Sequence, residues 1–333
     1  TGRKAMKKYI ISRILLMFLL LALVSVFSFI VIQLPPGDFV TKYVASLGQY
    51  DSATFGPEFE EALRKQLGFD KSMPEQYFYW MGNFLRGDMG RSMEWRTSVN
   101  SLVMDRLPLT IGLSLLTLAF TYALAIPIGI FSARHQYSAA DYFFTCLGFI
   151  GLATPSFFLA LVLMYALNRF FGLSAGGIYS VEFLNAPASF AKFIDMCKHL
   201  PLPIFIIMLQ GMAGIIRVMR GQTLDEIKRP YVVAARARGL EENALIYRYP
   251  VRVALNPIVS SAGNMLAAIV SGMTVTAIVL NVPTIGSLLY NALLSQDMYL
   301  AGSCIMILSA LTVIGMFLSD ILLVLVDPRI RLD

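Results

Sequence analysis

The sequence predicts an all-α protein that is embedded in a membrane and crosses the bilayer six times. Of its 333 residues, 57% are hydrophobic and 14% are charged, whereas soluble domains average about 45–50% and about 25%. An apolar excess of this size cannot be buried in one water-soluble core. Apolar segments of spanning length recur along the chain, and the charged residues gather between them, as in polytopic membrane proteins.

Six apolar segments approach or exceed the length of about 20 residues that a membrane-spanning helix needs. The fourth is short, and we expect it to extend toward Met219; the third contains Pro155, so we expect a kink there. The first segment follows Lys7 and Lys8, as in a signal peptide. It is longer than the apolar part of a signal peptide and no small-residue cleavage site follows it, so we interpret it as a retained span. The segments are Ile14–Leu34, Leu109–Phe131, Tyr142–Phe171, Leu200–Ile216, Pro257–Leu280 and Ala301–Val326.

The distribution of basic residues predicts how the chain is oriented. With the amino terminus inside, the inner connections contain 16 Lys and Arg and seven acidic residues, and the outer ones contain 11 and 13. Because cytoplasmic connections carry an excess of basic residues, we expect both termini to be cytoplasmic. The inner segments are then 1–13, 132–141, 217–256 and 327–333, and the outer segments are 35–108, 169–199 and 281–299.

These spans divide the chain into five parts. Thr1–Ala5 precede Met6 and are interpreted as a remnant of cloning. The other parts are an N-terminal segment with the first span (6–34), an extracytoplasmic domain (35–108), a core of five further spans (109–326) that includes the long inner connection 217–256, and a cytoplasmic tail (327–333).

The outer connection 35–108 is too long for a simple turn. Its run Phe59–Gly68 predicts a short helix that ends at the glycine, and an aromatic stretch at 77–80 and a glycine-containing stretch at 87–92 follow. One interpretation is a small folded domain on the outer face. The other places the aromatic side chains in a belt at the membrane interface: Tyr77, Tyr79 and Trp80.

The inner connection 217–256 predicts an Ala-rich helix with basic residues on one side. The helix should begin near Pro230, because proline fits the first helical position, and end at Gly239. Its small side chains would allow another surface to approach closely: Ala234, Ala235 and Ala237. The alternative is a basic loop attracted to anionic lipid, and the pattern alone does not decide between the two.

The same segment resembles the EAA loop of ABC importer permeases. Val233-Ala234-Ala235, three residues and Gly239 match that motif, with valine in place of the glutamate that gives it its name. The wider run 231–240, with Asn256-Pro257 further on, is similar to the oligopeptide/dipeptide branch, which typically lacks the glutamate too.

Further fragments resemble that branch in the same order along almost the whole chain after Met6. They are Arg13-Ile14-Leu15, Leu34-Pro35-Pro36-Gly37-Asp38, Leu67-Gly68-Phe69-Asp70, Gly87-Asp88-Met89-Gly90-Arg91-Ser92, Ile126-Pro127-Ile128-Gly129-Ile130, Thr154-Pro155-Ser156-Phe157 and Asp327-Pro328-Arg329-Ile330-Arg331.

The resemblance implies a fold of the type I ABC importer kind and a set of partners. Two homologous permeases would form one pathway, of which this chain resembles the first. Two ABC ATPases would receive the EAA helices, and an extracytoplasmic binding protein would deliver substrate in a bacterial or archaeal plasma membrane. The implied coupling residues are Tyr231, Ala234, Ala235, Ala237, Gly239 and Pro257; those at the outer mouth are Trp80, Gly87, Asp88, Gly90 and Ser92.

The sequence predicts no catalytic site and no metal site in this chain. It has no GxxxxGK[ST] phosphate loop, so ATP and Mg²⁺ should be bound by the partner ATPases rather than by this chain. His135 and His199 are isolated, and the three cysteines are far apart and lack a CxxC spacing. No nucleic-acid partner and no single substrate contact are predicted.

Two other classes of protein and several substrates stay open. An ion-coupled secondary transporter would require inverted repeats and paired intramembrane charges, and the sequence offers little beyond Asp320. A membrane scaffold without transport activity is the other class. Within the importer interpretation, peptides are expected first, then oligosaccharides, nickel or other small solutes.

Overall fold

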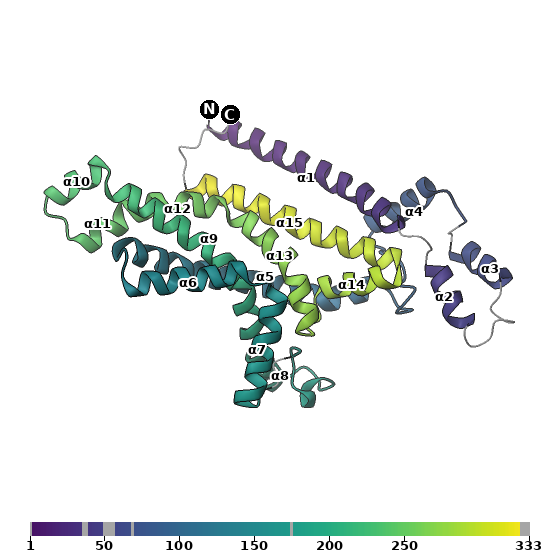
Figure 1. Cartoon of the computed structure of the whole chain (residues 1–333). Coiled ribbons are helices and arrows are strands. Elements are labelled where there is room, and N and C mark those ends of the chain that lie inside the picture. Colours follow the sequence, from purple (N-terminus) through teal and green to yellow (C-terminus); the bar gives the residue numbers. More distant parts are fainter. Residues whose placement is uncertain (1, 35–38, 49–56, 68–69, 174–175, 327–333) are drawn as a thin grey trace. The chain divides into compact units, whose positions relative to one another are not determined.

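The computed structural model describes residues 2–34, 39–48, 57–67, 70–173 and 176–326 (Figure 1). Over these residues it is helical, and its one bridge of the β type joins Arg91 to Ser98. The helices are α1 (Gly2–Gln33), α2 (Phe39–Gly48), α3 (Pro57–Leu67), α4 (Met73–Leu85), α5 (Val99–Arg134), α6 (Ala139–Ala153), α7 (Ser156–Phe171), α8 (Phe190–His199), α9 (Pro201–Ile227), α10 (Pro230–Ala237), α11 (Glu242–Arg248), α12 (Pro250–Ser260), α13 (Ala262–Val279), α14 (Ile285–Ser295) and α15 (Met298–Val326), with a 3-10 turn η1 (Val181–Phe183).

The apolar helices confirm the predicted class of all-α polytopic membrane protein. In the described part of the chain, five helical stretches are long and apolar enough to cross a membrane, and α6 with α7 makes a sixth if the bent pair is one span. Each of the six predicted segments overlaps one of these. The five stretches are Ile10–Gln33, Val99–Arg134, Phe190–Ile227, Ala262–Val279 and Met298–Ile321.

The kink expected at Pro155 is a sharp break. α6 ends at Ala153, Thr154 is extended (φ −97°, ψ 124°), and α7 begins after Pro155. The axes of the two helices differ by 111°. Proline lacks an N–H and disfavours a helical residue before it, which accounts for the position of the break.

Three predicted boundaries differ from the structure because packing overrides local composition. α5 begins at Val99, ten residues before the predicted Leu109, since Val99, Leu102 and Val103 are buried. α9 continues to Ile227 through the basic residues that suggested a loop. The predicted fifth span is divided at Ser261, between α12 and α13.

Other predictions meet the structure in part. The short helix of the outer connection is present as α3, although its terminal Gly68 lies outside the described residues, as do 35–38 and the tail 327–333. The connection 281–299 contains the additional helix α14.

The chain divides into two compact units, of which unit 1 comprises Thr1–Pro108 and Thr284–Leu311. Its core joins the end of α1 to α4, the start of α5, α14 and the start of α15. Trp80 is 2% exposed at its centre. A Cβ on Gly302 would lie 2.7 Å from the Trp80 ring, so glycine is needed for this close approach.

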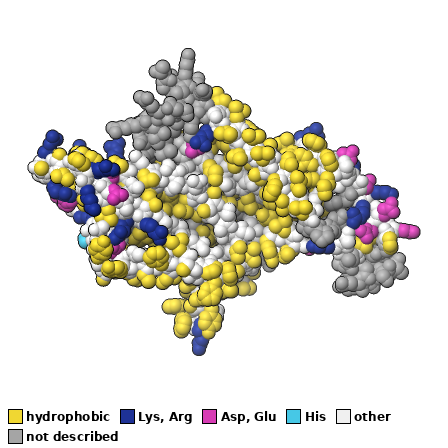
Figure 2. All heavy atoms as spheres, turned by 45° about the horizontal axis from the view of Figure 1, so that its top comes forward, with side chains coloured by type: hydrophobic (Ala, Val, Ile, Leu, Met, Phe, Trp, Pro, Cys, Tyr) yellow, Lys and Arg dark blue, Asp and Glu magenta, His cyan; other side chains and the backbone are white. Residues whose placement is uncertain are grey.

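Unit 2 comprises Leu109–Pro283 and Thr312–Asp333 and is organised around α9. α9 packs against α6, α7, α12 and α13 (Figure 1). Gly151 of α6 allows a close approach, because a Cβ there would lie 2.6 Å from the carbonyl oxygen of Leu209. Figure 2 shows hydrophobic side chains over the helices, with Lys and Arg gathered over the end formed by α10 and α11.

Candidate functional site: the α10–α11 hairpin

The predicted Ala-rich helix is present as α10, and it forms a hairpin with α11. Arg229 is extended (φ −68°, ψ 145°) and Pro230 occupies the first turn, where its missing N–H is not needed. The chain reverses at Gly239, which has a φ of +81°. A Cβ at Gly239 would meet nothing within 4 Å, so the backbone conformation alone favours glycine there.

The two faces of α10 have different roles. Val232 and Ala235 are buried, at 0% and 8% exposure, in a cluster with residues of α9, α11 and α12. The opposite face is exposed and consists mostly of small or apolar side chains. Its members are Tyr231, Val233, Ala234 and Ala237, with Gly239 exposed just beyond the helix.

The prediction for Ala235 is therefore corrected. Ala235 was expected to face a partner, but the structure places it against the chain's own hydrophobic cluster. A small side chain is needed at this position for α10 to lie close to its own unit. The surface open to a partner is offset from Ala235 and centres on Ala234 and Ala237.

Ionic contacts fix the hairpin from both ends. Arg236 donates two hydrogen bonds to the Glu242 carboxylate, at 3.0 and 2.7 Å, and so joins α10 to α11. These bonds lower the pKa of Glu242. At the other end, Tyr231 donates a hydrogen bond to Glu226 at the end of α9. Desolvation, followed by this contact with a carboxylate, raises the pKa of Tyr231 to about 12, so the hydroxyl stays protonated at neutral pH.

The hairpin is also attached to the end of α5. Arg134, the last residue of α5, donates a 2.7 Å hydrogen bond to Asn243 of α11. In the first turn of α6, Asp141 is 3% exposed and forms a 3.0 Å ion pair with Arg220 of α9. The facing ends of α5 and α6 therefore contact the hairpin and the helix that leads into it.

Pro257 lies inside α12, four residues before the break that separates α12 from α13. The carbonyl groups just before Ser261 accept additional hydrogen bonds from hydroxyl groups of two other helices. Tyr122 donates to the carbonyl of Ile258 at 3.2 Å. Ser319 donates to the carbonyls of Val259 and Ser260, at 3.2 and 3.3 Å.

The residues predicted at the outer mouth fall into two groups. Gly87 and Gly90 have positive φ values (85° and 83°) in an exposed loop, and Asp88 accepts a hydrogen bond from the Gly90 amide. Trp80 and Ser92 are buried, at 2% and 1% exposure, and support the loop from inside unit 1. The prediction that these two side chains face a partner is therefore corrected.

Asp297, which is completely buried in unit 1, was not predicted from the sequence. Its position is the signal that could have revealed it, because an Asp directly before a long apolar run marks the start of a helix. The Asp141–Arg220 pair was not predicted either, although Ser138, three residues before Asp141, is a similar signal of a helix start. No group of three or more potential metal ligands occurs among the residues that the structure describes.

Comparison with known proteins decides the family. The model of the binding-protein-dependent transport system inner membrane component matches residues 125–332, and its N-terminal counterpart matches residues 6–114. The chain belongs to this family. The first match contains the α10–α11 hairpin, and the second contains the loop of Gly87 and Gly90.

Two oligopeptide permease proteins align with almost the whole chain. The oligopeptide transport system permease protein AppB of Bacillus subtilis is 32% identical, and the alignment covers 98% of this chain and 100% of AppB. The oligopeptide transport system permease protein OppB of Haemophilus influenzae is 28% identical, with coverage of 98% and 100%. A chain of the MetNI methionine ABC transporter in an inward-facing conformation shares the fold, with a TM-score of 0.53 at 15% identity, over 68% of this chain and 96% of that one.

Proposed function

We propose that this protein is the permease subunit of an ATP-driven ABC importer of peptides. It pairs with a second homologous permease to form the translocation path, and two ABC ATPases drive the cycle. An extracytoplasmic binding protein supplies the substrate. The complex lies in a bacterial or archaeal plasma membrane, with both termini of this chain in the cytoplasm.

The α10–α11 hairpin is the observation that carries this proposal. Its exposed face offers Ala234 and Ala237 to a partner, and small side chains allow close docking of a second surface. Arg236 joins the two helices of the hairpin, and Tyr231 and Arg134 join the hairpin to α9 and α5 of its own unit. A force applied by a docked ATPase is therefore passed to α9 and α5 instead of being absorbed by a flexible loop.

Energy is supplied in trans. The sequence lacks a phosphate loop, so ATP and Mg²⁺ are bound by the ATPase subunits. ATP-driven closure of those subunits moves the two hairpins of the paired permeases, and the spans alternate between inward-facing and outward-facing states.

The relatives described above favour peptides over the other substrates of such importers. AppB and OppB are both named as oligopeptide permeases. An oligosaccharide importer built on the same machinery is the second candidate, and an ion-coupled transporter is a distant third.

Reconstitution of the whole complex tests the proposal. The permease pair, both ATPases and the binding protein are placed in liposomes without an ion gradient, and uptake of labelled trialanine, maltotriose and Ni²⁺ is measured with and without ATP. We expect trialanine uptake that requires ATP and is abolished when the ATPase carries an inactive phosphate loop. Uptake of maltotriose or Ni²⁺ alone would overturn the substrate assignment, and uptake that needs an ion gradient instead of ATP would overturn the mechanism.

A further inference from the structure

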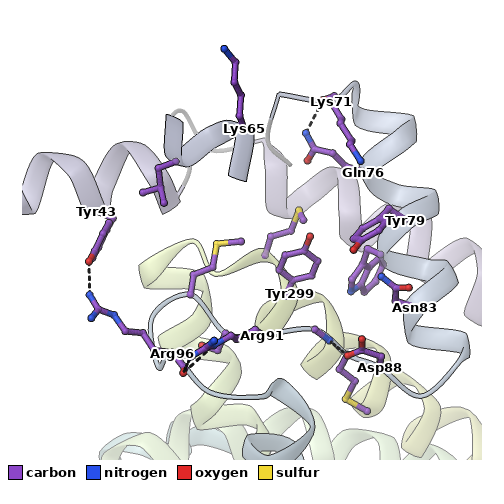
Figure 3. A pocket seen from close by; sticks show the side chains of 17 residues that line it. Tyr43, Lys65, Lys71, Gln76, Tyr79, Asn83, Asp88, Arg91, Arg96 and Tyr299 are labelled. Atoms are coloured by element: carbon purple, nitrogen blue, oxygen red, sulfur yellow. Dashed lines mark hydrogen bonds between the residues drawn. The ribbon is translucent and has the colours of Figure 1, made fainter. Parts of the chain in front are cut away.

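Unit 1 contains a cavity of about 630 Å³ that the proposed coupling mechanism does not use (Figure 3). Its walls come from α2, α3, α4, the loop that follows α4, and the start of α15. Pockets for small molecules usually measure about 300–1,000 Å³. The cavity therefore has the size of a small-molecule site rather than that of a flat protein interface.

Three cations line the cavity without a carboxylate partner among the described residues: Lys71, Arg91 and Arg96. The Arg91 guanidinium donates to the carbonyl oxygen of Arg96, at 3.1 and 2.7 Å. Arg96 donates to the Tyr43 hydroxyl and lies 5.5 Å from the centre of that ring. Lys71 lies 5.3 Å from the centre of the Tyr79 ring. These neutral contacts orient the cations, and Glu75, which forms no ion pair with Lys71, still interacts with its charge.

The other charged groups of the lining leave it with a net positive charge. Asp88 is the one acid among the described lining residues, and the 2.9 Å hydrogen bond that it accepts from the Gly90 amide leaves its negative charge in place. Lys65 forms a 2.9 Å ion pair with Glu61, and in Figure 3 its side chain points away from the cavity. The three cations therefore outnumber the one carboxylate of the described lining.

Aromatic and thioether side chains form the rest of the wall. Tyr299 lies between the cations in Figure 3, with Tyr79 beside it, and Met93 and Met298 also line the space. Such a wall suits an apolar or aromatic group. Lys71, 5.3 Å from the centre of the Tyr79 ring, suits a carboxylate.

We infer that this cavity binds a small organic anion in which a carboxylate lies beside an apolar group, which is the chemistry of the carboxyl-terminal end of a short peptide. Lys71 binds the carboxylate, and Tyr79 and Tyr299 contact the adjoining apolar part, while Arg96, on the other side of Tyr299, adds to the positive charge of the cavity. The choice of a peptide as the source of this chemistry rests on the proposed function. The site gives the permease a substrate contact of its own, outside the apolar helices.

The chain carries its own reporter for a binding experiment. It has two tryptophans, of which Trp80 lines the cavity and Trp95 is exposed nearby. In a Trp95→Phe background, the full-length chain in lipid nanodiscs is titrated with trialanine and with its carboxyl-terminal amide, and Trp80 fluorescence is recorded. Equilibrium dialysis with labelled trialanine measures binding independently of the fluorescence.

We expect saturable binding of trialanine, and binding of the amide at least about tenfold weaker, because a charge-assisted contact is lost. The Lys71→Gln substitution should weaken trialanine binding by a similar factor, and Arg96→Gln should weaken it less, because Arg96 does not contact the carboxylate. Lys65→Gln is the matched control and should leave it unchanged. Unfolding temperatures identify any variant that fails to fold. Lys71 lies on an exposed turn, so Lys71→Gln tests the site while the Arg96–Tyr43 contact is kept.

Several outcomes would overturn the inference. Equal affinity for the acid and the amide would exclude a carboxylate site, and the absence of trialanine binding in dialysis would exclude a peptide site. If the substitutions weaken association with the binding protein while trialanine does not bind, the surface is a protein-docking face instead. ATP-driven peptide uptake without binding here refutes this inference alone, whereas binding without uptake refutes the proposed function.

Discussion

The hydroxyl of Ser92 donates a 2.6 Å hydrogen bond to the carboxylate of Asp297, a residue 205 positions away in the sequence. The amides of Met93 and Glu94 donate to the same carboxylate oxygen, at 2.8 and 3.2 Å. The other oxygen accepts from the Leu300 amide at 3.2 Å. One buried carboxylate therefore caps the start of α15 and holds the loop that follows α4.

Replacing Asp297 by Asn should destabilise unit 1 strongly. All the groups around the carboxylate are donors, so the amide NH₂ of asparagine would face another N–H or O–H. We expect a loss of roughly 2–4 kcal/mol, since a buried charged acceptor is replaced and a donor is left unpaired. The free energy of unfolding is measured by SDS titration in mixed micelles. Glu94→Gln, at an exposed acid of the same loop, is the control and should change the free energy of unfolding little. Equal losses in the two variants would contradict the stabilising role of the Asp297 carboxylate.

Two glycines of α13 should respond in opposite ways to alanine. A Cβ on Gly263 would lie 2.6 Å from the Cα of Met316 and 2.9 Å from the carbonyl oxygen of Gly315, whereas one on Gly272 would meet nothing within 4 Å. Because backbone cannot move aside as a side chain does, Gly263→Ala should cost about 1–3 kcal/mol. Gly272→Ala should be neutral or stabilise the helix by up to about 1 kcal/mol. The same SDS titration compares them, and a neutral Gly263→Ala would mean that α13 and α15 are not in close contact there.

Substitution of Gly239 should separate ATP hydrolysis from transport. The φ of +81° is unfavourable for a β-branched residue, so Gly239→Val should strain the turn by about 1–2 kcal/mol. Gly239→Asn should do less, because asparagine tolerates this conformation. In the reconstituted complex we expect fewer peptides transported per ATP for the valine variant.

Gly221 of α9 supplies the control for that experiment. A Cβ there also meets nothing within 4 Å, but no unusual backbone angle is present. Gly221→Ala should therefore keep the wild-type ratio of transport to hydrolysis. If Gly239→Val assembles into the complex and keeps that ratio too, the turn has no part in coupling.

The α10–α11 hairpin should loosen in acid. The hydrogen bonds from Arg236 lower the pKa of Glu242 below its ordinary value of 4.5. A carboxylate with a lowered pKa contributes its full stabilisation above its ordinary pKa and loses it as the pH falls through the lowered value, so the loss lies below about pH 5. The effect is small, because the pair is exposed to solvent.

Hydrogen exchange of the hairpin amides, corrected for the intrinsic effect of pH, checks this prediction. Exchange in α10 and α11 should accelerate as the pH is lowered from about 5 to 3. The acceleration should be absent in Glu242→Gln, which is loose at every pH, and retained in the neighbouring control Glu241→Gln. If exchange still accelerates in Glu242→Gln, the pH dependence belongs to another titratable group.

Local patterns predicted much of this structure. The apolar periodicity and length of the spans depend on composition within each segment, and so do the start of α10 at Pro230 and the turn at Gly239. A kink at Pro155 was expected as well, because proline disrupts a helix through its own local geometry. These features are set by residues that are neighbours in the chain.

Features that depend on distant residues could not be predicted in this way. α5 begins early because Val103 packs in unit 1, and the polar residues Asp105 and Arg106 concealed that continuation. The break at Ser261 is supported by hydroxyls of Tyr122 and Ser319 from other helices. The burial of Ala235 beside exposed Ala234 follows from where α11 and α12 lie, which the alanine-rich sequence does not specify.

The two chain segments that meet at the hairpin lie against each other in unit 2. α9 enters the hairpin as an unbroken helix of 27 residues, about 40 Å long at 1.5 Å per residue, and α12, which follows α11, packs along α9. A displacement of the hairpin is therefore shared by both helices. Because α6, α7 and α13 also pack against α9, the displacement reaches all of them through one helix.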